Sequence, residues 1–264
     1  RHAATRVCGR FSAVHYLRVA TLNIHKGLSH FNRRMVIHEL RDGLRALDAD
    51  IVFLQEVQGL NERHALRFAR WPISPQHEFL AEGQWQHAYG RNAVYEHGHH
   101  GNAILSRFPI RTVANRDVSN HRFEQRGLLH CEIEVPEVAK PVHAVCVHLS
   151  LHARGRRRQL ETLSQHLSDL VAPSDPLIVA GDFNDWRHAA SRSLSVSLGL
   201  QEVSIESSGR PARTFPSLLP LLRLDRIYVR GFGVSAARAH RGKPWSLLSD
   251  HLALSADIAL PKRI

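Results

Sequence analysis

The sequence is poor in cysteine and has no long hydrophobic run, and each absence excludes a class of protein. Its 264 residues contain three cysteines, Cys8, Cys131 and Cys146, an odd number without metal-ligand spacing. This argues against a disulfide framework and against a thiolate zinc site. No apolar run reaches the roughly 20 residues that a membrane-spanning helix needs. We therefore expect a protein of a reducing compartment, the cytoplasm.

Residues 1–16 lack the apolar block of a signal peptide. The rest of the chain shows no linker, no break in composition and no internal repeat. Its hydrophobic content of 43% is enough for a large core. We therefore expect an N-terminal extension over residues 1–16 and one domain over residues 17–260. We expect it to be a monomer.

Lysine is scarce, whereas arginine is abundant. Only four lysines occur among 35 basic residues, and the formal net charge is +11. A positive balance favours an anionic partner such as nucleic acid, phospholipid or a phosphorylated metabolite. The excess of arginine is also what codon bias would produce, and the longest basic run extends only from Arg154 to Arg158. Charge therefore supports an anionic substrate without selecting one.

The stretch GDFND at residues 181–185 closes an apolar run, residues 176–180, that predicts a short buried strand. Side chains two apart in an extended chain share a face, so Asp182 and Asn184 point the same way. Asp182 is a carboxylate that can accept a proton, and the amide of Asn184 can donate and accept hydrogen bonds. One such stretch could be no more than a strand end and a turn.

The same pattern recurs at other predicted strands, which favours a constructed site. Asn23 ends the alternating strand at residues 17–24, and Glu56 ends a nearly continuous apolar run that begins at Ile51. The alternation places Glu56 on the face of Val52 and Leu54. Three further polar positions follow or begin apolar strands: His148, Asp225 and the pair Asp250-His251.

Two helices are predicted from apolar residues at helical spacing, one over about residues 36–47 and one over about residues 160–170. Ser29 or Asn32 is the expected N-cap of the first. The segment at residues 211–224 is rich in proline and apolar residues, which predicts a long ordered loop. Within it, residues 216–224 (PSLLPLLRL) could either pack into the core or contact a membrane surface.

The polar residues at these strand ends suit metal-assisted chemistry. Asn23, Glu56, Asp182, Asn184 and Asp250 offer oxygen ligands without thiolate, a set that suits Mg²⁺ or Mn²⁺ rather than Zn²⁺. His148 and His251 can transfer protons, and a buried Asp225 would fix the tautomer of His251. These residues by themselves indicate a metal-dependent hydrolase of an anionic ester.

An ordered series of seven motifs resembles the endonuclease/exonuclease/phosphatase family. The motifs are TLNIHKG (21–27), LQEV (54–57), GNAILSRFPI (101–110), VHL (147–149), GDFND (181–185), LDRIYV (224–229) and SDH (249–251). Each motif alone is weak, but seven in order make a chance match improbable. Within the family, the start NIHKG and the stretch GRPARTFPS resemble uncharacterised bacterial hydrolases.

The resemblance implies an α/β (α+β) fold, a four-layer sandwich of two mainly antiparallel sheets with helices outside. It implies a metal site at Glu56 and Asn23, completed by Asp250. It also implies a catalytic set in which Asp182 activates water, Asn184 holds water or phosphate, and Asp225 orients His251. His148 would bind a phosphoryl oxygen or assist the leaving group, which argues against the abasic-site endonuclease branch.

The resemblance therefore predicts a Mg²⁺- or Mn²⁺-dependent phosphoesterase, and a phosphodiesterase is the type we favour. The substrate stays open between nucleic acid and a phospholipid or phosphorylated small molecule, and we favour a phosphodiesterase that need not be a nuclease. An alternative is a catalytically inactive anion-binding module. That alternative predicts the loss of acid and base residues, yet all of them are present.

Overall fold

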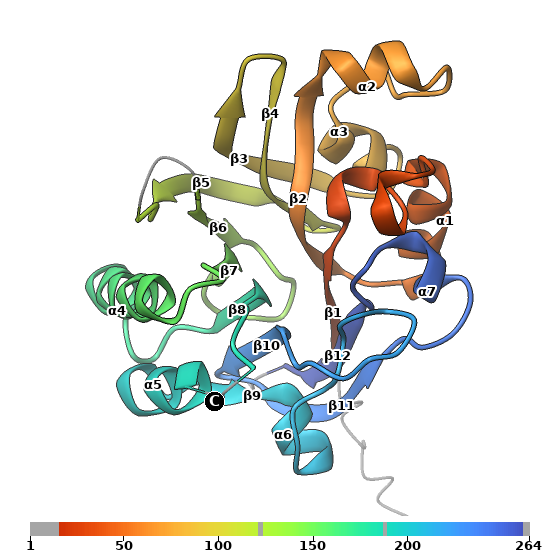
Figure 1. The fold of residues 1–264 in the computed structure, drawn as a ribbon. Helices are drawn as coiled ribbons and strands as arrows, with labels where there is room; N and C mark the ends of the chain where they lie inside the picture. The colour runs from red at the N-terminus through yellow and green to blue at the C-terminus, as the bar shows by residue number, and fades with distance from the viewer. Residues whose placement is uncertain (1–15, 121–123, 187–188, 261–264) are drawn as a thin grey trace, which may run out of the picture.

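Two six-stranded sheets packed face to face form the centre of the computed structural model, which describes residues 16–120, 124–186 and 189–260 (Figure 1). The strand order of the first sheet is β11 (Gly233–Ala239), β12 (Leu254–Ala259), β1 (Tyr16–Asn23), β2 (Ile51–Asn61), β4 (Gly98–Ser106), β3 (Gln86–Tyr95). That of the second is β5 (Ile110–Asp117), β6 (Gly127–Ile133), β7 (Val142–His148), β8 (Leu177–Asp182), β10 (Asp225–Arg230), β9 (Gln201–Glu202). Only the pairs β1–β2 and β7–β8 are parallel.

Helices lie on the outside of both sheets (Figure 1). Those beside the first sheet are α1 (Ile37–Leu47), α2 (Glu62–Arg67), α3 (Gln76–Ala81) and α7 (Trp245–Leu248). Those beside the second are α4 (Ala153–Leu170) and α5 (Ala189–Leu198), and α6 (Val203–Ser208) packs near β10 and β11. The four-layer sandwich predicted from the sequence is confirmed.

The buried apolar residues form three clusters that correspond to these layers. One cluster fills the space between the sheets and includes Val19, Phe53, Cys146 and Ile227. A second lies between the first sheet and its helices, and a third lies between the second sheet and α4 and α5. Every central strand is therefore buried on both faces, which explains why their sequences are nearly continuous apolar runs.

The first helix begins later than its expected cap. Residues 25–32 form two short 3₁₀ turns, η1 (His25–Gly27) and η2 (His30–Asn32), and α1 begins at Ile37 with Val36 as its N-cap. The prediction of Ser29 or Asn32 as the cap of α1 is therefore wrong. The hydroxyl of Ser29 instead accepts a hydrogen bond from the backbone N–H of Arg34 (3.1 Å). This bond stabilises the loop that precedes α1.

The segment between α6 and β10 is the long ordered loop that the sequence predicts. Its backbone forms a hairpin, in which Leu222 pairs with Thr214 and Phe215. Of the predicted N-terminal extension, residues 1–15 lie outside the described residues, and Tyr16 is the first residue of β1. In the described ranges, no helix is both long and apolar enough to cross a membrane.

Candidate active site

Four polar side chains lie at one end of the core between the two sheets. Asn23, His148, Asp182 and Asp225 each continue a strand face whose other members belong mainly to that core, Thr21 on the face of Asn23 being the polar exception. The strand register brings three of them together, because Asp182 is paired with His148 across the parallel β7–β8 ladder and with Asp225 across the antiparallel β8–β10 ladder. The alternation read from the sequence is confirmed at these positions.

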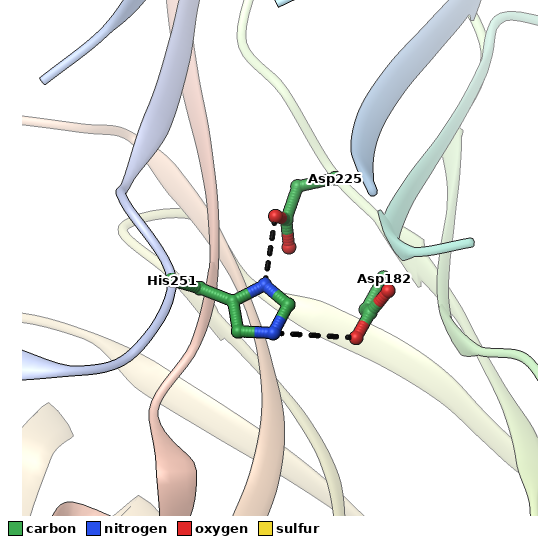
Figure 2. A group of neighbouring side chains, drawn as sticks. All are labelled: Asp182, Asp225 and His251. Carbon is green, nitrogen blue, oxygen red and sulfur yellow. Dashed lines mark hydrogen bonds and ion pairs between the residues drawn. The ribbon is translucent and has the colours of Figure 1, made fainter. Parts of the chain in front are cut away.

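The imidazole of His251 lies between the carboxylates of Asp225 and Asp182 (Figure 2). Its Nδ1 donates a hydrogen bond to Oδ2 of Asp225 at 2.9 Å, and its Nε2 lies 3.8 Å from Oδ2 of Asp182. The hydroxyl of Thr214 accepts a hydrogen bond from the backbone N–H of Asp225 (3.3 Å). Asp225 therefore fixes both the orientation and the Nδ1 proton of His251, as the sequence predicted.

Burial and charge shift the ionisation of this group in opposite directions. Burial alone would lower the pKa of His251, but the negative charges of Asp225 and Asp182 outweigh it and raise the pKa to about 10. Burial is the largest influence on Asp182 and raises its pKa to about 6, although the charge of His251 opposes that rise. Near neutral pH, His251 is therefore a cation, and Asp182 is a carboxylate poised to accept a proton.

Asp182 is held by two amides. The side-chain Nδ2 of Asn23 donates to Oδ2 of Asp182 (3.2 Å), and the backbone N–H of Asn184 donates to Oδ1 (2.9 Å). Asn184 adopts a positive φ of 48°, and its side chain donates to the carbonyl of Leu149 (3.0 Å). A backbone conformation that is strained for a residue other than glycine is common at active sites.

His148 is buried beside this group, with Nε2 3.6 Å from Oδ2 of Asp182. Burial, followed by the positive charge of Arg126, holds the pKa of His148 well below its ordinary value. His148 is therefore a neutral imidazole near neutral pH, and it can donate one hydrogen bond and accept another. Its chemical role differs from that of the cationic His251.

A β-bulge in β2 places Glu56 differently from the simple alternation. The register of β2 against β4 shifts between Leu54 and Val57, and Glu56 has a positive φ of 56°. Val57 consequently joins Val52 and Leu54 in the helix-side core, so the prediction that Glu56 shares their face is wrong. Bulges commonly redirect a side chain next to an active site.

The redirected carboxylate of Glu56 lies among positively charged and titratable groups. Oε2 is 3.2 Å from Nζ of Lys26, and Glu56 lines a small cavity together with His100, Arg126 and His148. Burial would raise the pKa of Glu56, but the positive charge of Lys26 outweighs burial and holds the pKa well below its ordinary value. Glu56 is therefore ionised across the physiological pH range.

The residues present fit a divalent metal ion at Glu56. Apart from its ion pair with Lys26, the buried Oε2 of Glu56 has no hydrogen-bond partner among the described residues. Oδ1 of Asn23 accepts one backbone hydrogen bond (3.1 Å) and retains a second lone pair. Asp250 is partly exposed, and its Oδ1 lies 3.5 Å from Nδ1 of His25. These oxygen donors suit a hard cation.

Asp182, Asp225 and His251 also lie close enough to share a metal ion. However, the proton on Nδ1 of His251 already satisfies Asp225, and a cationic imidazole has no lone pair for a metal. These properties suit proton transfer and charge stabilisation in this group, and they leave Glu56 as the better candidate for a metal ligand.

Several supporting residues lie outside the set of candidate site residues read from the sequence. Arg126 is mostly buried and borders the Glu56 cavity. Asn102 of the GNAILSRFPI motif donates to the carbonyls of Gly127 and Cys146 and lines the same cavity. Ser249 donates to the carbonyl of Asn23 (2.6 Å), a contact that no local pattern could predict because 226 residues separate the two.

The fold and this arrangement are compatible with hydrolysis of phosphoester bonds, and comparison with known proteins identifies the family. The chain belongs to the Endonuclease/Exonuclease/phosphatase family, whose model matches residues 20–251. Enzymes of this family typically hydrolyse phosphoester bonds and generally depend on a divalent metal.

Relatives of this chain occur in bacteria. It is 51% identical over 244 residues to the uncharacterized protein YbhP of Escherichia coli, covering 92% of this chain and 96% of that protein. A Vibrio cholerae UPF0294 protein is 36% identical over 113 residues, 42% of this chain and 36% of its own length.

Solved structures show the same fold. The endonuclease/exonuclease/phosphatase from Beutenbergia cavernae aligns with a TM-score of 0.73 and 22% identity, over 93% of this chain and 72% of that one. TDP2 of Danio rerio, solved in complex with a single-stranded DNA product, aligns with a TM-score of 0.68 and 17% identity, over 92% of this chain and 98% of that one. At these identities the likeness extends to the fold alone.

Proposed function

We propose that this protein is a Mg²⁺-dependent phosphodiesterase that hydrolyses an anionic phosphodiester by attack of water. The observation that carries the proposal is the buried Asp225–His251–Asp182 line beside the ionised Glu56. It combines a proton acceptor, a fixed cation and a metal-binding carboxylate at one end of the core. These are the groups that phosphoester hydrolysis requires.

Each residue has a role that follows from its contacts. Asp182, with a pKa raised to about 6, accepts the proton of the attacking water, and Asn184 helps to hold that water. His251, kept cationic by Asp225, donates a hydrogen bond from Nε2 to a phosphoryl oxygen as negative charge develops there. His148, a neutral imidazole, hydrogen-bonds another phosphoryl oxygen or the leaving oxygen.

Glu56 and Asn23 would hold the metal ion, and Asp250 would complete the site. Mg²⁺, or Mn²⁺ in its place, would supply positive charge at this site for the phosphoryl and leaving oxygens. Lys26 balances the charge of Glu56 at 3.2 Å, and it keeps that carboxylate ionised for the metal.

The decisive experiment compares a soluble phosphodiester with the corresponding phosphomonoester. The purified protein should hydrolyse bis-(p-nitrophenyl) phosphate in a Mg²⁺-dependent manner and should act more slowly on p-nitrophenyl phosphate. Asp182→Asn removes the proton acceptor while preserving the side-chain shape, and it should abolish the activity. Hydrolysis that persists at the wild-type rate in Asp182→Asn would disprove the assigned mechanism.

A nuclease is the alternative. The net charge of +11 and the fold shared with TDP2, solved with single-stranded DNA, favour it. A nuclease contacts several phosphates, and each contributes about −0.9 to the slope of log affinity against log salt concentration. Plasmid cutting that is Mg²⁺-dependent, steeply suppressed by salt and lost in Asp182→Asn would identify a nuclease. A shallow salt dependence would favour a small or lipid phosphodiester.

We further propose a monomer that works in the cytoplasm as one catalytic domain over residues 17–260. Cys131 and Cys146 are buried free thiols, which suits a reducing compartment. The apolar core shared by the two sheets supports a single domain.

A further inference from the structure

The hairpin between α6 and β10 carries three exposed leucines on an ordered backbone. Leu218, Leu219 and Leu221 are 62%, 65% and 57% exposed. The hairpin is closed by backbone hydrogen bonds, including Thr214 N–H to the Leu222 carbonyl (2.9 Å) and Leu222 N–H to the Phe215 carbonyl (2.7 Å). The leucines are therefore presented by a fixed structure, so little conformational entropy would be lost if they bound a partner.

Two further exposed apolar side chains, Phe31 and Leu247, belong to segments that contact this hairpin. The hydroxyl of Ser217 lies 3.1 Å from Nε2 of His30 and 3.3 Å from the carbonyl of Ser246. Their chain neighbours Phe31 and Leu247 are 76% and 42% exposed. A single exposed leucine needs no explanation, but several around one hairpin mark an interaction surface.

A strongly basic pocket adjoins the base of the same hairpin. It has a volume of about 430 Å³ and lies between α6, β11 and the two ends of the hairpin. None of the described residues that line it is acidic, and five are arginines: Arg210, Arg213, Arg223, Arg238 and Arg241. Like charges repel one another, so an anion in this pocket would be strongly favoured.

The hairpin is also connected directly to the candidate active site. The hydroxyl of Thr214 accepts from the backbone N–H of Asp225 (3.3 Å), and the ring of Phe215 lies 4.9 Å from that of His251. The backbone N–H of Ser217 donates to the carbonyl of Asp250 (2.7 Å). A surface that binds the hairpin therefore lies close to the catalytic groups.

We propose that this hairpin docks the protein on an anionic phospholipid bilayer. The leucines enter the apolar boundary of the bilayer, and the arginine pocket binds headgroup phosphates. Docking then presents a lipid phosphodiester to Asp182 and His251, a last step that rests on the proposed function.

The chemistry of the hairpin favours a bilayer over a nucleic acid. Single strands bind by stacking successive bases on aromatic side chains, whereas this surface has the exposed leucines Leu218, Leu219, Leu221 and Leu247 and one aromatic residue, Phe31. Aliphatic side chains combined with the arginine side chains of the adjoining pocket match a bilayer that has an apolar interior and an anionic surface.

Sedimentation with vesicles tests the docking without any catalytic step. The wild-type protein should bind vesicles of phosphatidylcholine mixed with phosphatidylglycerol more tightly than vesicles of phosphatidylcholine alone. The triple change L218S/L219S/L221S should weaken binding at least about tenfold, because full burial of one leucine is already worth that factor. The control L66S/I73S/V196S replaces three apolar residues elsewhere that are even more exposed, and it should bind like the wild type.

The arginine pocket is tested by a second matched pair. R210Q/R238Q/R241Q should weaken binding to the anionic vesicles by about fivefold per arginine and reduce its salt dependence. R63Q/R70Q/R192Q removes the same charge from exposed positions elsewhere and should have a much smaller effect. Equal losses in the two variants would overturn the role of the pocket.

Three results would overturn the docking itself. The first is that L218S/L219S/L221S binds anionic vesicles as tightly as the wild type does. The second is that the control L66S/I73S/V196S loses as much affinity as the leucine variant. The third is that the wild type binds single-stranded DNA more tightly than anionic vesicles, through the same residues. Thermal unfolding confirms that each variant is folded.

The catalytic consequence is measured separately. The leucine variant should hydrolyse phosphatidylglycerol in vesicles at least about tenfold more slowly, while hydrolysis of bis-(p-nitrophenyl) phosphate stays unchanged. Equal rates on vesicles in variant and wild type would overturn the link between docking and catalysis. A wild-type protein that binds vesicles yet hydrolyses neither substrate would contradict the proposed function and leave the docking surface supported.

Discussion

Replacing Asp225 by asparagine should uncouple His251 from the active site without disturbing the fold. The two side chains are buried and joined at 2.9 Å, and asparagine retains an oxygen that can accept the Nδ1 proton. At that distance, the interaction between unit charges is about 6 kcal/mol for an effective dielectric constant of about 20. Loss of the charge should therefore lower the pKa of His251 by several units.

The direct assay is an NMR titration of the His251 imidazole. In the wild type the ring should stay protonated until the pH approaches its pKa of about 10. In Asp225→Asn it should lose its proton at a much lower pH, because burial is then opposed only by Asp182 and Asp250. Asp42→Asn, an exposed carboxylate on α1, is the control and should leave the titration unchanged.

Kinetics test the same coupling. Asp225→Ala and His251→Ala should each reduce kcat/KM about 10²- to 10⁴-fold, the usual range for an acid–base group. The double variant should be little worse than the poorer single variant, because the two residues act as one unit. Additive losses in this cycle, or an unchanged His251 titration in Asp225→Asn, would refute the reasoning.

Three other changes have defined outcomes. Glu56→Gln should weaken Mg²⁺ binding in calorimetry at least about tenfold with an unchanged unfolding midpoint, and wild-type affinity would remove Glu56 from the metal site. Burial, followed by the charges of His143 and His166, lowers the pKa of His130 to about 4, so the unfolded chain binds more protons between about pH 4 and 6.5. The contribution of this imidazole to stability should therefore be complete above about pH 6.5 and fall by about 3 kcal/mol as the pH decreases to about 4, alongside similar contributions from His77 and His100, whose pKa values burial also lowers to about 4. In urea unfolding, His130→Gln should lose about 3 kcal/mol less stability than the wild type over that range, and an equal loss in both proteins would contradict the assignment. Gly181→Ala should destabilise the fold by at least about 2 kcal/mol in urea, because φ is 147° and a Cβ would lie 1.9 Å from the carbonyl of Val147; an unchanged midpoint would show that β8 can shift.

The sequence determined much of this protein by itself. Alternation of apolar and polar residues identified the strands, and it placed Asn23, His148, Asp182 and Asp225 at the ends of faces that the structure shows to be core-facing. This succeeded because the side-chain period of a strand is fixed at two, so a buried face can be read locally. The order of the motifs also predicted the family, which the match over residues 20–251 confirms.

Only the tertiary structure decided what depends on contacts between distant segments or on irregular backbone. The bulge at Glu56 breaks the strand period, and its positive φ has no counterpart in a pattern of alternation. The pKa values of Asp182 and His251 arise from burial and from charges brought together by strand register. The loop at residues 211–224 was equally compatible with packed core or exposed surface, because its apolar composition is the same in both cases. In the structure, backbone hydrogen bonds close the hairpin, and the side chains of Leu218, Leu219 and Leu221 lie outside the three clusters of buried apolar residues.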